Sequence, residues 1–263
     1  MTMHAQTLLT TAITAAENAC AEILTVYHSN DFQAEAKGDN SPLTLADRKA
    51  HQVITAILQA SSAYPILSEE GKTIPYAARK DWDYFWMVDP LDGTKEFIKR
   101  NDEFTVNIAL IHQGRPVLGV VAVPVTGDVF YATEGGGAFL KRGSTPRALP
   151  RKPITDLNQP GLRVVASRSH MNPETEAFIG RLTAPELVSA GSSLKFMLLA
   201  EGKADVYPRY APTMEWDTAA ADAIVREVGL RVMRQGPGQG GRESAEVLLY
   251  NKESLLNPFF LVC

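Results

Sequence analysis

The segment spanning residues 84–94 constrains the fold more than any other part of this chain. The apolar run Tyr84–Val88 predicts a buried strand. Proline has no N–H for a sheet ladder and restricts the residue before it, so we expect the strand to end at Asp89-Pro90. Asp92-Gly93 then favours a sharp turn. Two carboxylates are therefore predicted at the end of a rigid strand, with Thr94 beside them.

Carboxylate oxygens at a strand end are suitable ligands for a hard cation such as Mg²⁺. The simpler alternative is an ordinary surface turn, because Asp, Gly and Pro are common turn residues. Neither His nor Cys accompanies these aspartates, which argues against a zinc site. The segment alone leaves the choice between a magnesium site and a turn open.

Composition limits the class of protein. The chain has 263 residues, of which 45% are hydrophobic and 21% charged, as in ordinary globular proteins. A net charge of -4 gives no basic excess for nucleic acid binding. No apolar run approaches the roughly 20 residues of a membrane span, and no signal peptide is evident. Cys20 and Cys263 form no metal or disulfide motif, so we expect a cytoplasmic protein.

The first part of the chain is predicted to contain two helices followed by a meander of strands. Leu8–Tyr27 shows helical spacing of apolar residues, and Thr44 is a good N-cap for a second helix. The connections between the later strands are too short for crossover helices, so we expect antiparallel pairing. The predicted strands are Pro65–Ser68, Phe104–Ile111, Val117–Val123 and Asp128–Thr133.

Residues 147–160 contain three prolines and few apolar residues, which suggests a domain boundary. We therefore expect an N-terminal α+β subdomain, residues 1–148, and a C-terminal α/β subdomain, residues 149–263. In the second part we predict the strands Leu162–Ser167, Leu187-Val188 and Val247–Tyr250, the helices Glu174–Leu182, Leu194–Ala200 and Glu215–Val228, and a flexible loop at Gly236–Gly241. This alternation implies a layered α/β or α+β protein.

Several other charged residues have ordinary structural interpretations. Asp47 falls in the first turn of a helix, where a carboxylate stabilises the helix dipole. Glu69-Glu70-Gly71 is typical of a solvated turn, and Lys195 of a solvated helix face. Asp217, however, begins a helix, so it lies at an element boundary as Glu69, Asp89 and Asp92 do. Functional side chains are often presented at such boundaries.

Three motifs in this order resemble the inositol monophosphatase superfamily of Mg²⁺-dependent, lithium-sensitive phosphatases. They are Leu67-Ser68-Glu69-Glu70, Asp89-Pro90-Leu91-Asp92-Gly93-Thr94 and Trp216-Asp217-Thr218-Ala219-Ala220. The resemblance covers essentially the whole chain. Within the superfamily, Lys95-Glu96-Phe97-Ile98 and Gly191-Ser192-Ser193-Leu194-Lys195-Phe196 are most similar to the bacterial CysQ-type 3'(2'),5'-bisphosphate nucleotidases.

This resemblance implies a fold, a metal centre and a substrate. The fold would be α+β, a layered α-β-α-β-α sandwich with the metals where two subdomains meet. One Mg²⁺ would be held by Glu69, Asp89 and the carbonyl of Leu91, and a second by Asp89, Asp92 and Asp217. Asp47 matches an acidic position near a third, weaker metal.

The remaining implied roles concern water and substrate. Thr94 would orient the attacking water, and Glu69 or Glu70 would help to accept its proton. The substrate would contact the metal-binding motif and the Gly191 segment, through Glu69, Leu91, Asp92, Gly93, Thr94, Ser192, Ser193, Lys195 and Asp217. The implied reaction converts adenosine 3',5'-bisphosphate to AMP and phosphate, in sulfur assimilation or nucleotide recycling.

Other activities stay open at this point. The same fold hydrolyses inositol phosphates or sugar bisphosphates. A haloacid-dehalogenase-like phosphatase would use Asp89 as a nucleophile, but that class has Asp-x-Asp, whereas two residues separate the aspartates here. A non-enzymatic phosphate or cation sensor would bind Mg²⁺ without releasing phosphate. Monomer and homodimer, and peripheral association with the cytoplasmic face of the inner membrane, are equally compatible with the sequence.

Overall fold

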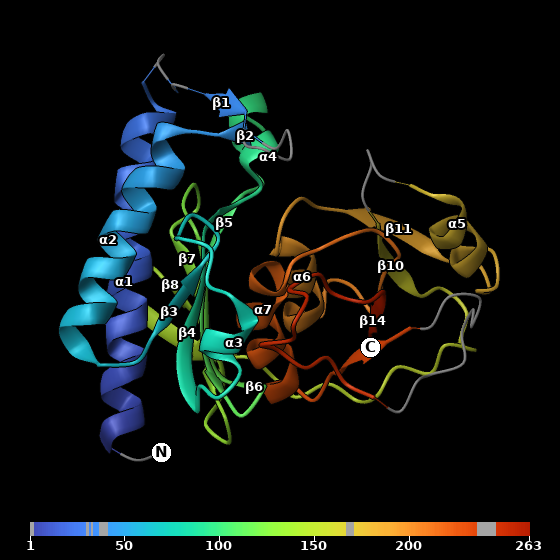
Figure 1. Cartoon of the computed structure of the whole chain (residues 1–263). Helices are drawn as coiled ribbons and strands as arrows, with labels where there is room; N and C mark the ends of the chain where they lie inside the picture. The colour runs from blue at the N-terminus through green and yellow to red at the C-terminus, as the bar shows by residue number, and fades with distance from the viewer. Residues whose placement is uncertain (1–2, 30–31, 33, 37–41, 167–170, 236–245) are drawn as a thin grey trace.

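The protein is built in five alternating layers of helices and strands. The structure, a computed structural model, describes residues 3–29, 32, 34–36, 42–166, 171–235 and 246–263. A pair of long helices covers one face of a large sheet, and two further helices cover the other face (Figure 1). Smaller sheets and a short helix form the remaining two layers (Figure 1). This arrangement agrees with the predicted α-β-α-β-α sandwich.

The helices and strands have the following bounds. The helices are α1 (Met3–Tyr27), α2 (Leu45–Ser61), α3 (Tyr76–Arg79), α4 (Thr94–Lys99), α5 (Pro173–Ile179), α6 (Leu194–Glu201) and α7 (Glu215–Glu227). The strands of the large sheet are β3 (Ile66–Ser68), β4 (Tyr84–Asp92), β5 (Thr105–His112), β6 (Arg115–Val123), β7 (Asp128–Thr133), β8 (Gly137–Arg142) and β9 (Thr145–Ala148). The others are β1 (Glu35–Ala36), β2 (Pro42–Leu43), β10 (Arg163–Ala166), β11 (Glu186–Ser189), β12 (Tyr207–Arg209), β13 (Val232–Arg234) and β14 (Phe260–Val262).

The large sheet follows chain order, β3-β4-β5-β6-β7-β8-β9. β3 pairs with β4 in parallel, and every later neighbour is antiparallel. The predicted antiparallel meander is therefore confirmed. The parallel pair places the ends of β3 and β4 at the same edge of the sheet, so residues that follow either strand come close together.

The predicted end of β4 was wrong. The strand does not stop at Asp89-Pro90 but continues to Asp92, with an irregularity between Asp89 and Asp92. Asp89 pairs with Asn107 and Asp92 with Thr105, so two residues on β4 oppose one on β5. Pro90 lies within this bulge, where no ladder donor is needed. The bulge turns both aspartates toward the same end of the sheet.

Both faces of the sheet are buried, which explains why its central strands are almost entirely apolar. On β4, Trp86 and Val88 belong to the core shared with α1 and α2. Phe85 and Met87 alternate with them and belong to the core shared with α6 and α7. The side-chain alternation of one strand thus joins both helical layers to the sheet.

Helix α7 packs closely on β6. A Cβ atom on Gly119 would overlap the carbonyl oxygen of Ala220 and approach the Cβ of Ala223 to 2.8 Å. The predicted inward face of this helix is confirmed, because Ala220, Ala221, Ile224, Val225 and Val228 are all buried. Small residues therefore set the height of α7 above the sheet.

The second half of the chain forms small sheets. β10 and β11 pair in parallel, and β14 lies between β12 and β13. The predicted strand Val247–Tyr250 was wrong: Val247 makes only an isolated bridge with Met233. The last strand is instead β14, which the sequence patterns did not predict. The predicted loop Gly236–Gly241 lies outside the described residues.

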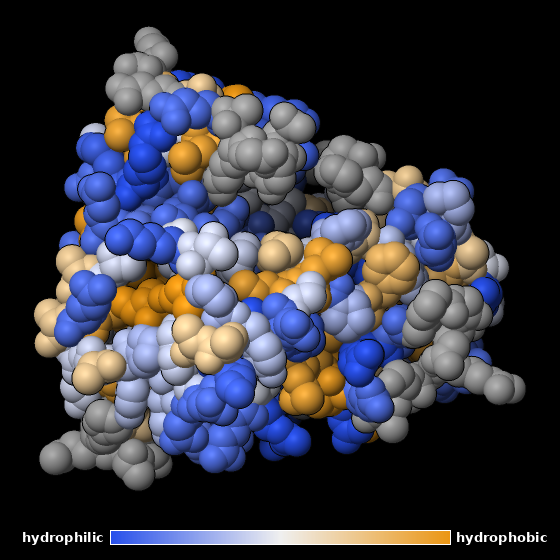
Figure 2. Space-filling model, in the orientation of Figure 1, coloured by the Kyte–Doolittle hydropathy of each residue, from blue (hydrophilic) through white to orange (hydrophobic). Residues whose placement is uncertain are grey.

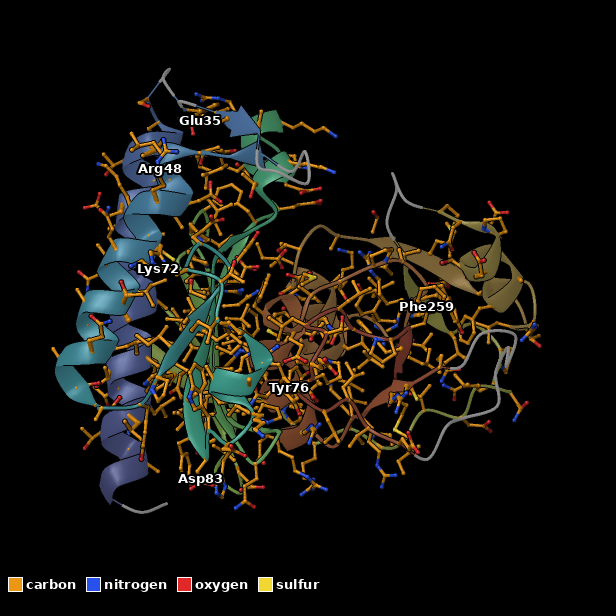
Figure 3. The ribbon with its side chains drawn as sticks, viewed as in Figure 1. Glu35, Arg48, Lys72, Tyr76, Asp83 and Phe259 are labelled. Carbon is orange, nitrogen blue, oxygen red and sulfur yellow. The ribbon has the colours of Figure 1, made fainter. Side chains whose placement is uncertain are left out.

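The proposed boundary at residue 148 coincides with the end of β9, the last strand of the large sheet. Because α7 then packs on the sheet of the first half, the division into two subdomains stays a prediction. Among the described residues, no helix is long and apolar enough to cross a membrane. Hydrophilic residues cover much of the face that Figure 2 shows. One surface ion pair joins Arg48 of α2 to Glu35 of β1 at 3.3 Å (Figure 3).

Candidate functional site

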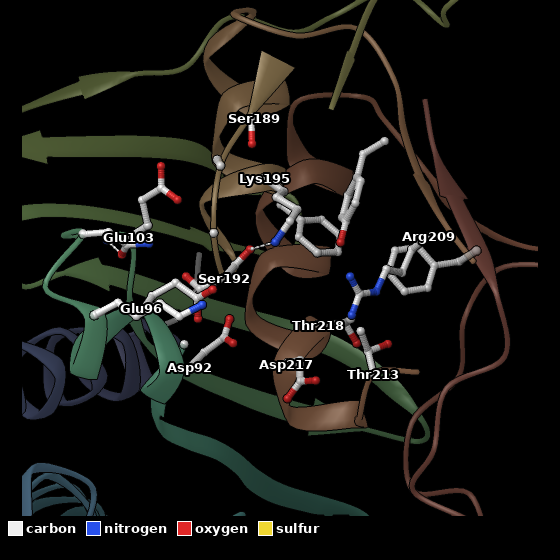
Figure 4. A pocket seen from close by; sticks show the side chains of 18 residues that line it. Asp92, Glu96, Glu103, Ser189, Ser192, Lys195, Arg209, Thr213, Asp217 and Thr218 are labelled. Atoms are coloured by element: carbon white, nitrogen blue, oxygen red, sulfur yellow. Dashed lines mark hydrogen bonds between the residues drawn. The ribbon is translucent and has the colours of Figure 1, made fainter. Parts of the chain in front are cut away.

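A polar pocket of about 480 Å³ lies where the edge of the large sheet meets α6 and α7. Asp92 and Asp217 point into it from two different elements, while Lys195 and Arg209 lie across from them (Figure 4). Glu96 and Glu103 line the same cavity, and their charges act on Lys195, so acidic and basic groups are mixed along its wall. The two cationic side chains suit a ligand that carries anionic groups.

Asp89 lies deepest, with only 1% of its surface exposed. Its Oδ1 accepts a hydrogen bond from the Leu91 amide at 3.1 Å, which fixes the carboxylate within the bulge. Burial, followed by the charges of Glu69, Asp92 and Asp217, raises its pKa well above the ordinary value.

Asp217 belongs to the first turn of α7. Its Oδ2 accepts from the Met214 amide at 2.9 Å, so the side chain caps its own helix. Burial raises its pKa strongly, with further contributions from Asp92 and Glu69. The helix N-terminus and the carboxylate thus face the pocket together. Asp92 and Asp217 are more than 100 residues apart in the sequence, yet the charge of Asp92 raises the pKa of Asp217.

Asp92 is held by a polar network that the sequence patterns did not reveal. Ser193 Oγ lies 2.9 Å from Asp92 Oδ2 and 2.9 Å from the Asp217 carbonyl oxygen. Asn107 Nδ2 donates to Ser193 Oγ at 2.9 Å, and Thr105 Oγ1 donates to Asn107 Oδ1 at 3.1 Å. The sequence signal for this network was the presence of two polar residues, Thr105 and Asn107, in an otherwise apolar predicted strand. Burial raises the pKa of Asp92, and Lys195 opposes that shift.

Asp47 combines a structural and a site position. Its Oδ2 accepts from the Thr44 amide at 2.7 Å in a capping box, so the predicted N-cap is confirmed. Its Oδ1 accepts from Thr94 Oγ1 at 3.1 Å. Thr94 Oγ1 also lies 3.3 Å from the Leu91 carbonyl oxygen. The start of α2 is thereby linked to the end of β4, and helix capping is only part of the role of Asp47 in the structure.

The structure contradicts the solvated interpretation of Lys195. The side chain is only 7% exposed, and its Nζ donates to the Ser192 carbonyl at 3.1 Å. Burial lowers its pKa, while the Asp92 carboxylate raises it. Gly93 also lines this pocket, and two features of its position favour glycine. Its φ is +96°, and a Cβ atom there would lie 3.1 Å from the Glu103 carbonyl oxygen.

The carboxylates fit a divalent cation by their chemistry. Two like charges about 4 Å apart repel by roughly 4 kcal/mol at an effective dielectric constant near 20, so such a cluster needs a compensating positive charge. In the described part of the chain, no three acidic, histidine or cysteine side chains converge into a ready-made metal site. The helix cap uses only one carboxylate oxygen of Asp217, Oδ2, so capping does not prevent Oδ1 from binding a cation.

The remaining predicted positions lie around the same region. Glu69 directly follows β3, and its amide donates to the Val88 carbonyl at 3.0 Å, beside Asp89. Glu70 occupies the following turn, which closes with a 3.0 Å bond from the Gly71 amide to the Ser68 carbonyl. Ser192 Oγ lies 3.1 Å from Thr105 Oγ1. The assignment of these residues to metal, water and substrate stays a prediction.

Comparison with known proteins gives a consistent result. The model of the inositol monophosphatase family matches residues 4–257. A 3'(2'),5'-bisphosphate nucleotidase CysQ from Salmonella typhimurium is 44% identical over 250 residues, or 94% of this chain and 96% of the relative. Its namesake from Escherichia coli strain K12 is 43% identical over the same shares. The crystal structure of CysQ from Bacteroides thetaiotaomicron superposes with a TM-score of 0.84 at 47% identity, covering 99% of this chain and 97% of that one.

Proposed function

Because this chain belongs to the inositol monophosphatase family, we propose that it is a Mg²⁺-dependent 3'(2'),5'-bisphosphate nucleotidase that converts adenosine 3',5'-bisphosphate to AMP and phosphate. The observation that carries this proposal is the presence of the buried Lys195 and of Arg209 in the same pocket as Asp92 and Asp217. Asp89 lies behind this pocket, close enough to Asp92 and Asp217 for their charges to raise its pKa. The relatives' names point to the same substrate.

The proposed metal ligands divide into two sets that share Asp89. Glu69, Asp89 and the Leu91 carbonyl would hold one cation, and Asp89, Asp92 and Asp217 the other. Asp47 would lie near a third, weaker cation. When bound, such cations lower the pKa of a water molecule and neutralise the charge of a phosphate monoester. Mg²⁺ suits an all-oxygen set because it prefers carboxylates, carbonyls and water.

The protein's own groups would position the reactants. Thr94 donates a hydrogen bond to Asp47, so the lone pairs of its hydroxyl oxygen are left to accept a hydrogen bond from the attacking water. Glu69 or Glu70 would then accept the water's proton. The N-terminus of α7 would stabilise negative charge on the reacting phosphate. Phosphoryl transfer depends mainly on such positioning and neutralisation.

Lys195 and Arg209 would receive the phosphate that does not react. Lys195 is a point charge held by burial, whereas Arg209 is anchored through Nε and Nη2 to the carbonyls of Ala211 and Pro212, at 3.2 and 3.0 Å. Ser192, Gly93 and the other predicted contacts lie around the phosphate and ribose in this proposal. A substrate with one phosphate would use only the carboxylate side.

Phosphate release from a panel of monoesters tests the proposal. With Mg²⁺, we expect adenosine 3',5'-bisphosphate to be turned over faster than inositol 1-phosphate or a sugar bisphosphate, and without Mg²⁺ none should react. Preference for inositol 1-phosphate would refute the substrate while keeping the family's chemistry. Mg²⁺ binding without phosphate release would instead indicate a sensor.

A variant tests the second phosphate site. Lys195→Met removes the charge but keeps much of the apolar stem. We expect its KM for adenosine 3',5'-bisphosphate to rise about 10- to 100-fold, because a charge-assisted hydrogen bond contributes about 1.5–3 kcal/mol. The KM for adenosine 3'-monophosphate should change far less. Lys203→Met, at an exposed lysine paired with Glu201 just beyond the same helix, is the control.

A further inference from the structure

The loop between β3 and β4 is tied to the far end of the chain by one buried arginine. Arg79, the last residue of α3, is only 2% exposed. Its Nη1 donates to Asn251 Oδ1 and to the Lys252 carbonyl, both at 2.7 Å, and its Nη2 donates to the Glu253 carbonyl at 2.9 Å. Asn251 Nδ2 donates back to the Arg79 carbonyl at 2.7 Å.

The acceptors of this guanidinium are neutral oxygens, all separated from it by more than 170 residues except the Ile74 carbonyl at 3.4 Å. The Tyr76 ring lies 5.2 Å from it, where a cation–π contact adds to the hydrogen bonds. Figure 3 places Tyr76 between the large sheet and the elements of the second half. A buried guanidinium whose donors bind carbonyl and amide oxygens of a distant segment holds the two segments together.

Residues 251–257, which accept the hydrogen bonds of Arg79, also contact the start of α7. Glu215, the first residue of α7, is fully buried, and its carboxylate accepts from the amides of Asn251 at 2.6 Å and Lys252 at 3.0 Å. Lys252 Nζ also binds this carboxylate. Asn257 Nδ2 donates to the Met214 carbonyl at 2.8 Å and to Thr218 Oγ1 at 3.0 Å. Residues 251–257 are therefore fixed to α7 by both backbone and side-chain hydrogen bonds.

Two of the proposed metal ligands lie at the ends of this connection. Glu69 begins the segment that Arg79 ends, and Asp217 follows Glu215 by two positions. Glu69 and Asp217 already sense each other's charge. Both halves of the carboxylate cluster are thus joined through Arg79 and residues 251–253, a connection that we name the arginine clasp.

We propose that Arg79 is a positioning residue for the cation centre: through the arginine clasp it holds the Glu69 segment against the start of α7. The inference rests on the proposed function only in taking Glu69 and Asp217 as cation ligands. Without the clasp, the ligands have to be brought together from a looser ensemble. Mg²⁺ affinity then falls, because binding must order the segment that Arg79 otherwise keeps in place.

Isothermal titration of the metal-free protein with MgCl₂ is the primary test. Arg79→Met is expected to weaken Mg²⁺ binding about 10- to 100-fold, the range typical for residues that orient metal ligands. With saturating Mg²⁺ and substrate, its kcat should fall less than about threefold. Arg79→Lys should be nearly as impaired, because one ammonium group cannot reproduce the planar fork that reaches three acceptors. Wild-type Mg²⁺ affinity in Arg79→Met or Arg79→Lys would overturn the proposal.

Hydrogen exchange separates positioning from general stabilisation. In Arg79→Met we expect faster amide exchange confined to residues 69–82 and 250–257 before the protein unfolds. The matched control is Arg163→Met, which breaks an arginine–aspartate pair at 2.6 Å in the second half of the chain, away from the pocket. It should lower thermal stability without changing Mg²⁺ affinity. If Arg79→Met behaves in the same way, Arg79 is merely structural.

A milder variant keeps the proposal testable if Arg79→Met does not fold. Asn251 has a φ of +68°, a conformation that glycine adopts freely, so Asn251→Gly removes the amide without straining the backbone. We expect a 3- to 10-fold loss of Mg²⁺ affinity, and no further loss when it is added to Arg79→Lys. Additive effects would contradict a shared clasp. A wild-type protein that binds Mg²⁺ but does not cleave the bisphosphate would refute the proposed function and leave the clasp intact.

Discussion

The contact between Gly119 and α7 allows the link from packing to the metal site to be tested directly. In Gly119→Ala the new Cβ would overlap the Ala220 carbonyl oxygen and lie 2.8 Å from the Ala223 Cβ. Carbon atoms in contact normally lie about 3.5–4.0 Å apart, so α7 would have to move by about 1 Å. The nearest atoms are backbone atoms of Ala220 and the Cβ of Ala223, which cannot rotate away as the end of a flexible side chain could.

The expected cost follows from that displacement. Overpacking costs about 1–3 kcal/mol, and replacing a strand glycine by alanine returns up to about 1 kcal/mol of conformational entropy. Because the overlap is with backbone, we expect a net loss of about 1–2 kcal/mol. For a chain of this size, that loss corresponds to a fall in Tm of about 2–8 °C.

The displacement should also reach the candidate site. Ala220 lies one helical turn after Asp217, so a shift of α7 moves this carboxylate relative to Asp89 and Asp92. We expect Gly119→Ala to bind Mg²⁺ several-fold more weakly, measured by titration calorimetry, in addition to its lower Tm. The control is Gly143→Ala, where an added Cβ would meet nothing within 4 Å but φ is +64°, so the change costs stability without moving α7. An unchanged Tm would refute the packing argument, and unchanged Mg²⁺ affinity would refute the link to the site.

Three further variants test separate contacts. Asp89→Asn should abolish turnover yet leave the Tm of the metal-free protein unchanged or higher. Burial and neighbouring carboxylates raise the pKa of Asp89, so its contribution to stability is lost as the pH rises through the pKa of the folded state. A lower Tm or retained Mg²⁺-dependent activity would contradict this. Arg142 lowers the pKa of Asp128, so the ion pair's contribution to stability is present above the unfolded-state pKa of about 3.9 and is lost as the pH falls through the folded-state pKa. The urea midpoints of Asp128→Asn and of the wild type should therefore converge on acidification. A constant difference between the two midpoints would exclude the ion pair as the cause. Thr44→Ala should cost about 1 kcal/mol in urea unfolding through loss of the N-cap, whereas Thr44→Ser should cost little; equal losses would exclude capping.

Local sequence patterns predicted much of the fold because both sheet faces are covered. Alternating core contacts make β4, β5 and β6 nearly continuous apolar runs, and the short turns that join β5, β6 and β7 leave only antiparallel pairing there. The end of β4 was mispredicted because a proline was taken as a stop, whereas it occupies a bulge. β14 was missed because a short apolar run of three residues does not by itself distinguish a strand from other buried segments.

In the candidate site, the proposed cation ligands could be predicted from the sequence, whereas the residues that hold them in place could not. Residues that would bind a cation must carry particular oxygen groups, so Glu69, Asp89, Asp92 and Asp217 leave a pattern in the sequence. Their supports need no particular partner type: Arg79 binds main-chain carbonyls, which every residue possesses, and Asn107 acts through Ser193. Such contacts depend on where distant segments meet in space. A sequence can therefore indicate the atoms that would perform the chemistry, while the contacts that hold them in place become visible only in the folded chain.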